Sequence, residues 1–199
     1  MHTAIWRTLV GLVVATVTVV SAVQPTGASG QTAQAPRRGE SLAPFVPTPQ
    51  DVVERMLALA QVTSKDVVYD LGSGDGRLVV TAAKRYGARG VGIDIDPARI
   101  AEGRAKAKQA GVEHLVEFRQ QDALETDLSQ ASVVTLYLLS SSNVKLRPRL
   151  TSQLKPGARV VSHQFGMGDW QPDKVETFTD SNGTSRTLYL WTIGANTPR

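Results

Sequence analysis

Apolar residues fall into short blocks along residues 46–193, with the lengths expected of buried strands and amphipathic helices. Over 51–60 and again over 77–86, apolar or small residues recur at helical spacing. Five other apolar runs have strand length: 67–71, 90–95, 114–120, 131–139 and 158–163. This alternation of strands and helices predicts an α/β domain with a mostly parallel sheet.

The C-terminal part of the chain predicts a different connection. Two further strands, at about 174–180 and 186–193, flank Asn182 and Gly183, which are a strong tight-turn signal. These strands fit an antiparallel hairpin. The run 131–139 is the most continuously apolar, as expected of a central parallel strand. We therefore expect a doubly wound, mostly parallel seven-stranded sheet with an antiparallel last strand.

Three glycines follow the first strand with the spacing G-x-G-x-G. Gly72, Gly74 and Gly76, with Ser73 between the first two, form a loop that can turn sharply and bring its backbone against a ligand. Strand, glycine loop and helix are typical of the first βα turn of a doubly wound fold. The dinucleotide fingerprint G-x-G-x-x-G has its third glycine where this chain has Arg77, which argues against a dinucleotide.

Acidic residues mark the ends of the first two strands. Asp70 precedes the glycine loop, where a carboxylate repels a pyrophosphate and attracts a cationic amino-acid group. Asp94 lies 22 residues after Gly72, where a carboxylate is expected to accept hydrogen bonds from ribose hydroxyls. Asp96 and Pro97 are instead typical of an N-cap and a first helical residue. We assign Asp94 to ligand binding and Asp96 to structure.

The third strand ends in a similar way. Asp122 follows it, where an acidic side chain can accept a hydrogen bond from an adenine amino group. By itself Asp122 would be an ordinary loop residue, but it is the third polar residue to end a consecutive strand. Together with their neighbours Ile95 and Ala123, the acidic residues define a candidate ligand site along the ends of three strands.

Three motifs, D-L-G-S-G-D-G, G-I-D-I-D-P and Q-D-A, occur in this order within residues 67–123. Their order and spacing resemble those of the class I S-adenosylmethionine-dependent methyltransferases. The resemblance implies a Rossmann-like fold and an enzyme of class EC 2.1.1 with S-adenosyl-L-methionine as cofactor. It also implies that the cofactor is bound by Asp70, Gly72, Ser73, Gly74, Gly76, Asp94, Ile95, Asp122 and Ala123.

Flanking motifs carry a narrower resemblance, which covers about 44–175. They lie at 44–50, 137–140, 159–165 and 170–172. They are similar to motifs of the small protein-lysine methyltransferases, which include the mitochondrial enzymes modifying the c-subunit of ATP synthase and the adenine nucleotide translocator, with their prokaryotic relatives. This resemblance implies a protein substrate with a lysine acceptor, and a membrane protein is one candidate.

The methyl acceptor is expected beyond the end of the fourth strand. Residues 137–143 lack the Asn/Asp-Pro-Pro-Tyr clamp of methyltransferases that act on planar amino groups. Tyr137 either lines an acceptor channel or packs in the core. His163, which ends the fifth strand, either takes a lysine proton or orients a water, or it is an ordinary hydrogen-bonded histidine. Tyr137 and His163 are the catalytic candidates, while Ser140 or Asn143 is a candidate helix cap.

Two other functions remain open on the same sheet. A small-molecule methyltransferase would use the same cofactor residues. A nucleotide-binding oxidoreductase or a noncatalytic sensor would use the sheet without methyl transfer, and Arg77 argues against the oxidoreductase.

Composition and charge narrow these choices. The chain has a net charge of +4, but its basic residues are mixed with acidic ones, as in 99–108, which favours a solvated surface over a nucleic-acid partner. With no cysteine, the chain has no disulfide and no thiol nucleophile for cytosine C5 methylation. His2, His114 and His163 are too dispersed to suggest a metal site.

The sequence of the N-terminal segment bears on where the protein is located in the cell. Arg7 precedes an apolar run over 9–23, and small residues at 28–30 or 33–35 suit signal peptidase. Fifteen residues are short for a transmembrane helix, which needs about 20. Export to the periplasm is therefore the first interpretation. Because S-adenosylmethionine is made inside cells, the alternative is an uncleaved membrane anchor, associated through residues 5–23, with a cytoplasmic-facing domain.

Three segments follow from these features. Residues 1–30 are expected to be a signal peptide or membrane anchor, and residues 31–43 a flexible linker. Residues 44–199 are expected to form the methyltransferase domain, because about 155 residues are enough for one well-buried core.

Overall fold

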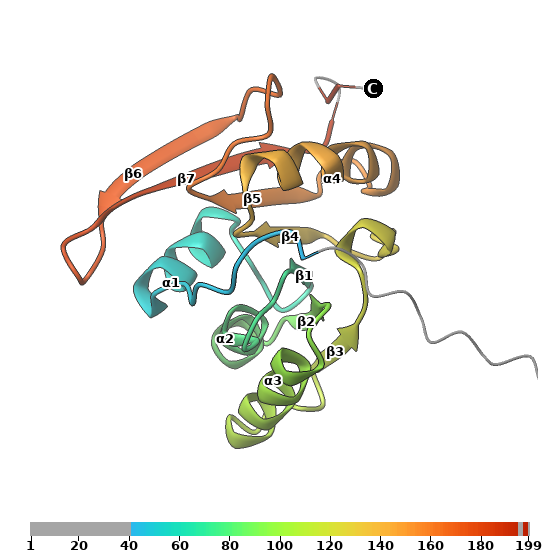
Figure 1. Cartoon of the computed structure of the whole chain (residues 1–199), viewed down its shortest axis with the longest axis vertical. Helices are drawn as coiled ribbons and strands as arrows, with labels where there is room; N and C mark the ends of the chain where they lie inside the picture. The colour runs from blue at the N-terminus through green and yellow to red at the C-terminus, as the bar shows by residue number, and fades with distance from the viewer. Residues whose placement is uncertain (1–40, 195–196, 199) are drawn as a thin grey trace, which may run out of the picture. The chain divides into compact units, whose positions relative to one another are not determined.

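The computed structural model describes residues 41–194 and 197–198, and within them an α/β sheet flanked by helices (Figure 1). The strands are β1 (Val67–Leu71), β2 (Arg89–Asp94), β3 (Val116–Gln120), β4 (Val133–Leu136), β5 (Arg159–His163), β6 (Lys174–Thr179) and β7 (Ser185–Thr192). The helices are α1 (Gln50–Leu59), α2 (Arg77–Tyr86), α3 (Pro97–Gln109) and α4 (Ser140–Gln153), with a 3-10 turn, η1 (Ala123–Glu125).

The seven strands lie in the order β3-β2-β1-β4-β5-β7-β6. The five strands from β3 to β5 are parallel, while β7 pairs antiparallel with both β5 and β6. The predicted doubly wound sheet with its final hairpin is confirmed. The order reverses beside β1, which pairs with β2 on one side and β4 on the other, so a crevice is expected at the carboxyl ends of these strands.

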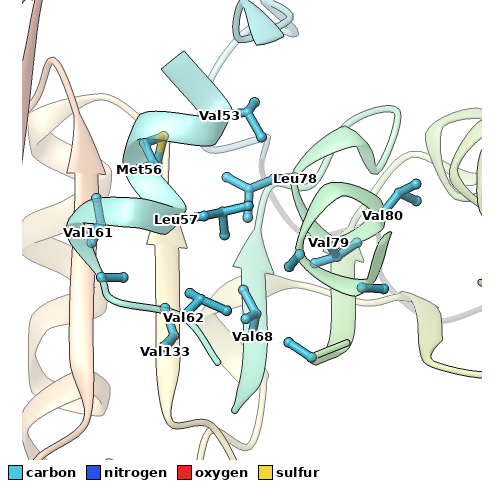
Figure 2. Close-up of a cluster of buried hydrophobic side chains, with 14 of the residues drawn as sticks. Val53, Met56, Leu57, Val62, Val68, Leu78, Val79, Val80, Val133 and Val161 are labelled. Carbon is cyan, nitrogen blue, oxygen red and sulfur yellow. The ribbon is translucent and has the colours of Figure 1, made fainter. Parts of the chain in front are cut away.

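Side chains of alternate residues in the central strands pack into two separate hydrophobic cores, one on each face of the sheet. Val68 of β1 faces the core under α1, α2 and α3, whereas its neighbour Tyr69 faces the core on the side of α4. Figure 2 shows the first core, where side chains of α1 and α2 lie over β1, β4 and β5. Its labelled members are Val53, Met56, Leu57, Val62, Val68, Leu78, Val79, Val80, Val133 and Val161. Fully burying each such side chain contributes about 1.5–3 kcal/mol.

Local signals set several boundaries as expected. Helix α2 has the predicted bounds 77–86, and it ends at Gly87 in the left-handed conformation that suits a glycine. Asp96 is the N-cap of α3, since its carboxylate accepts a hydrogen bond from Ala98 N at 2.8 Å, and Pro97 is the first helical residue. The structural assignment of Asp96 is confirmed.

Other boundaries differ from the sequence prediction. Strand β4 covers only Val133–Leu136 of the predicted 131–139 because the chain leaves the sheet at Tyr137 to enter α4. The N-cap of α4 is Leu139, without a side-chain cap, so the prediction that Ser140 or Asn143 caps a helix is wrong. Asn143 is instead buried within α4, where its Nδ2 donates to Phe165 O at 3.1 Å.

The segment before α1 contacts the domain earlier than the predicted start at residue 44. Ser142 Oγ of α4 donates a 2.6 Å hydrogen bond to Leu42 O, and Leu42 and Ala43 pack against the second core. The predicted signal peptide or anchor, and most of the predicted linker, lie outside the described residues. Within 41–194 and 197–198, no helix is long and apolar enough to cross a membrane.

Candidate functional site

A pocket opens at the carboxyl ends of β1, β2 and β4, where the strand order reverses. The glycine loop, the ends of β2 and β4 and the β3–η1 connection form its walls. Every residue from 41 to 48 also lines it, and we call this stretch the N-terminal strap. Eight of the nine predicted cofactor residues line the pocket: Asp70, Gly72, Ser73, Gly74, Asp94, Ile95, Asp122 and Ala123.

The glycine loop is fixed to the end of β2. The amides of Gly72 and Ser73 both donate to Ile93 O, at 2.9 and 2.8 Å, and Gly74 N donates to Asp94 Oδ2 at 2.8 Å. Gly72 has a φ of 80°, and a Cβ there would lie 2.9 Å from Leu138 Cδ2. The backbone of the loop therefore lies close to the end of β2 and to Leu138, which follows β4. Because the glycines carry no side chain, space remains beside the loop for a ligand.

Gly76 is the predicted cofactor residue that does not line the pocket. It precedes α2 with a φ of 75°, and a Cβ there would lie 2.4 Å from the Phe118 ring and 3.0 Å from Gly103 Cα. The structure gives Gly76 a packing role between α2, α3 and β3, and its contact with the cofactor stays a prediction.

Asp70 supplies a buried carboxyl group to the pocket. Burial, with a smaller contribution from the Asp94 and Asp75 carboxylates, raises its pKa to about 7, although the hydrogen bond from Thr135 Oγ1 at 2.8 Å acts in the opposite direction. No cation among the described residues pairs with this carboxyl group. An ammonium group on a ligand would stabilise its ionised form.

Asp94 and Asp122 are placed by backbone hydrogen bonds. Besides accepting from Gly74 N, Asp94 accepts from Asp96 N through Oδ1 at 2.9 Å. Asp122 Oδ1 accepts from Leu124 N at 2.8 Å and so caps η1. Each carboxylate oxygen has two lone pairs, so both side chains retain capacity to accept from a ribose or an adenine.

An ion cluster that the sequence analysis did not predict lies beside the glycine loop. Asp75 accepts from Arg77 Nη2 at 2.7 Å and from Lys106 Nζ of α3 at 2.6 Å. Burial alone would raise the pKa of Asp75, but the hydrogen bonds from Arg77 and Lys106 hold it well below its usual range. The only sequence signal was the acid–base pair at 75 and 77, which has no pattern that marks a site.

The two catalytic candidates lie together, but only one reaches the pocket. Tyr137 lines it, and its ring packs against that of His163, with centroids 4.0 Å apart and ring planes tilted by 33°. His163 is fully buried, and neither ring nitrogen has a hydrogen-bond partner among the described residues. Burial, with a smaller contribution from the charge of Arg186, lowers its pKa to about 4. His163 is therefore a neutral side chain that supports the Tyr137 ring. It does not line the pocket, where a catalytic base would have to act.

The side chains that line the pocket suit S-adenosylmethionine. Asp70 offers a carboxylate to an ammonium group, the glycine loop offers exposed backbone, and Asp94 and Asp122 offer acceptors at the ends of the next two strands. Across the described part of the chain, no group of three or more His, Cys, Asp or Glu residues has the arrangement of a metal site.

Comparison with known proteins identifies the family. Residues 70–174 match the ANTKMT methyltransferase domain. A protein-lysine N-methyltransferase of Saccharolobus islandicus is 45% identical over 152 residues, which cover 76% of this chain and 94% of that protein. A lysine N-methyltransferase of Xenopus laevis, named for the c-subunit of ATP synthase, is 30% identical over 141 residues, which cover 71% of this chain and 62% of that protein.

A solved structure agrees with this result. The crystal structure of an RNA methyltransferase from Salinibacter ruber in complex with S-adenosyl-L-homocysteine is 58% identical, with a TM-score of 0.72. The match covers 77% of this chain and 97% of that chain. S-Adenosylhomocysteine is what remains of the cofactor after its methyl group has been transferred. The chain therefore belongs to the ANTKMT methyltransferase domain family, with S-adenosylmethionine as its cofactor.

Proposed function

We propose that this protein transfers a methyl group from S-adenosylmethionine to the ε-amino group of a lysine in a protein substrate. The observation that carries the proposal is the acceptor end of the pocket, formed by Leu136 at the end of β4 and by Tyr137 and Leu138 after it. This end is apolar and aromatic, and it lacks the polar clamp that holds a planar amino group. The Saccharolobus and Xenopus relatives, which are named as lysine methyltransferases, support the same acceptor.

The site residues can perform this reaction by positioning the reactants. The bound cofactor supplies an electrophilic methyl group. Asp70 holds the cofactor's ammonium group, and Asp94 and Asp122 hold its ribose and adenine. The substrate lysine must arrive without its proton, and the apolar walls favour the neutral amine because burial lowers the pKa of a lysine. Tyr137, braced by His163, orients the amine toward the methyl group, so that much of the acceleration comes from alignment.

RNA is the second candidate substrate, because the Salinibacter structure is described as an RNA methyltransferase. The cations of the pocket wall favour protein instead. Arg77 pairs with Asp75, and Arg99 pairs with Glu102 at 2.6 Å. Phosphate binding by these side chains would have to break existing ion pairs.

Isotope-labelled S-adenosylmethionine distinguishes these substrates and also a small molecule. The full-length protein is incubated with labelled cofactor and, separately, with protein, RNA and metabolite fractions of the source cells. We expect label in protein, and mass spectrometry should find it on the ε-nitrogen of lysine. Asp94→Ala should lose most of the transfer. Label that survives protease but is released by ribonuclease, or label only in metabolites, would contradict the proposal.

We also propose that the protein is associated with a membrane or exported through residues 1–30. Support comes from the apolar run over 9–23, which follows Arg7. An uncleaved anchor with a cytoplasmic-facing domain leaves the enzyme where S-adenosylmethionine is made. The test is cell fractionation with N-terminal sequencing of the mature protein. An intact N-terminus in the soluble cytoplasmic fraction would contradict both the signal and the anchor.

A further inference from the structure

The N-terminal strap has no role in the motifs that identify the cofactor site, yet all of its residues line the pocket. It runs without helix or strand into α1, and Pro44, Pro47 and Pro49 restrict its backbone. Because the strap contacts the same pocket as the glycine loop, its position affects any ligand bound there.

Arg77 binds the C-terminal end of the strap, at Thr48. Its Nη1 donates to Thr48 O at 2.7 Å, while its Nε and Nη2 donate to Asp75 at 3.0 and 2.7 Å. Lys106 holds Asp75 from the other side. One guanidinium therefore joins the strap to the glycine loop, and its planar fork of donors suits this double contact.

Phe45 covers the glycine loop from the middle of the strap. A Cβ on Gly74 would lie 2.4 Å from Phe45 Cε2, so the ring occupies the space that the glycine leaves open. The guanidinium of Arg99 lies over the same ring, 4.1 Å from its centroid. Phe45 is nonetheless 46% exposed. A large apolar ring that is half exposed at the mouth of a ligand pocket gains contact area when a ligand is bound.

The far end of the strap, at Leu42, is held by packing against the second core and by one neutral hydrogen bond. Ser142 Oγ donates a single neutral hydrogen bond to Leu42 O. Such a bond contributes less than hydrogen bonds to a charged guanidinium.

We propose that the N-terminal strap is part of the S-adenosylmethionine site, with Phe45 as a cofactor-contacting residue and Arg77 as the positioning residue that holds the strap over the glycine loop. Phe45 lies on the side of Asp94, whose carboxylate bonds Gly74 N, and so covers the cofactor near its ribose. Arg77 acts through Thr48 and Asp75 without touching the cofactor itself.

Cofactor binding by the full-length protein tests this proposal without any methyl acceptor, so its result does not depend on which substrate is methylated. Phe45→Ala and Arg77→Gln should each raise the dissociation constant of S-adenosylmethionine about tenfold, mainly through faster dissociation in stopped-flow measurements. Arg77→Lys keeps the charge and should recover part of the affinity. The matched control is Arg85→Gln on the same helix, whose guanidinium pairs with Glu54 and does not line the pocket.

Two further readouts separate positioning from general stability. Melting of the cofactor-free Phe45→Ala protein should match the wild type, because the ring is half exposed. Hydrogen exchange at the Phe45 and Val46 amides should slow on cofactor binding in the wild type, and Arg77→Gln should abolish that protection. Wild-type affinity and dissociation rate in Phe45→Ala would overturn the contact, even if Arg77→Gln fails to fold. The same result in Arg77→Gln would overturn its positioning role.

Discussion

At the scale of single residues, Asp70 shows how the site suits a cationic ligand, because no cation among the described residues pairs with its carboxyl group. The carboxyl group is buried at the start of the glycine loop, beside two other acids of the pocket. The raised pKa means that, without a bound cation, this carboxyl group is partly protonated near neutral pH. A bound ammonium group would make ionisation favourable, so cofactor binding and proton release are coupled.

This coupling predicts a pH-dependent affinity. Below about pH 7 the free Asp70 is protonated, and binding must expel that proton, so S-adenosylmethionine affinity rises with pH up to about 7 and then levels off. The expected slope approaches tenfold per pH unit at acidic pH. Calorimetry between pH 5.5 and 8.5, in two buffers with different ionisation enthalpies, measures both affinity and protons released.

Asp70→Asn is the control for this prediction. An asparagine has nearly the same shape and can still accept from Thr135, but it does not titrate. The variant should bind S-adenosylmethionine more weakly at pH 8 and show a flat profile. A wild-type profile as flat as that of the variant would show that Asp70 does not face the ammonium group.

At the scale of helices and strands, the sequence predicted best those boundaries that depend on residues adjacent in the chain. The bounds of α2 and the N-cap at Asp96 depend on local spacing, and both are confirmed. The length of β4 was overestimated because apolar character reports burial, and Leu138 is buried after the chain has left the sheet. Helix α4 gave little signal, since its interior contains Pro148 and few apolar residues.

The close approach of the Phe118 ring to Gly76 predicts that only a glycine fits at position 76, where α2, α3 and β3 pack together. Gly76→Ala should destabilise the protein through two effects, a positive φ costing about 1–2 kcal/mol and overpacking costing about 1–3 kcal/mol. Gly111→Ala is the matched control, because Gly111 has a φ of +69° but nothing within 4 Å of a Cβ. Urea unfolding of both variants isolates the packing contribution. Equal losses of stability would show that Phe118 does not require Gly76.

At the scale of the whole molecule, the candidate site combines what the motifs predicted with contacts that they could not. The strand-end acids were predictable because parallel strands deliver their carboxyl ends to one edge of the sheet. The place of the strap over the pocket was missed, although 44–50 carries one of the flanking motifs, because Thr48 and Arg77 are 29 residues apart and residues 41–48 have no periodic pattern. The contact of the Tyr137 ring with His163 depends likewise on the pairing of β4 with β5, which no local motif predicts.

The most direct test of this account is calorimetric titration of the full-length protein and its Asp94→Ala variant with S-adenosylmethionine. The wild type should bind S-adenosylmethionine and not NAD. Asp94→Ala should bind at least about tenfold more weakly, because it loses a charged acceptor for the ribose and the bond that holds Gly74. Asp127→Ala, which removes an exposed acid outside the pocket, should bind like the wild type. If Asp94→Ala binds as tightly as the wild type, the cofactor does not lie where we place it.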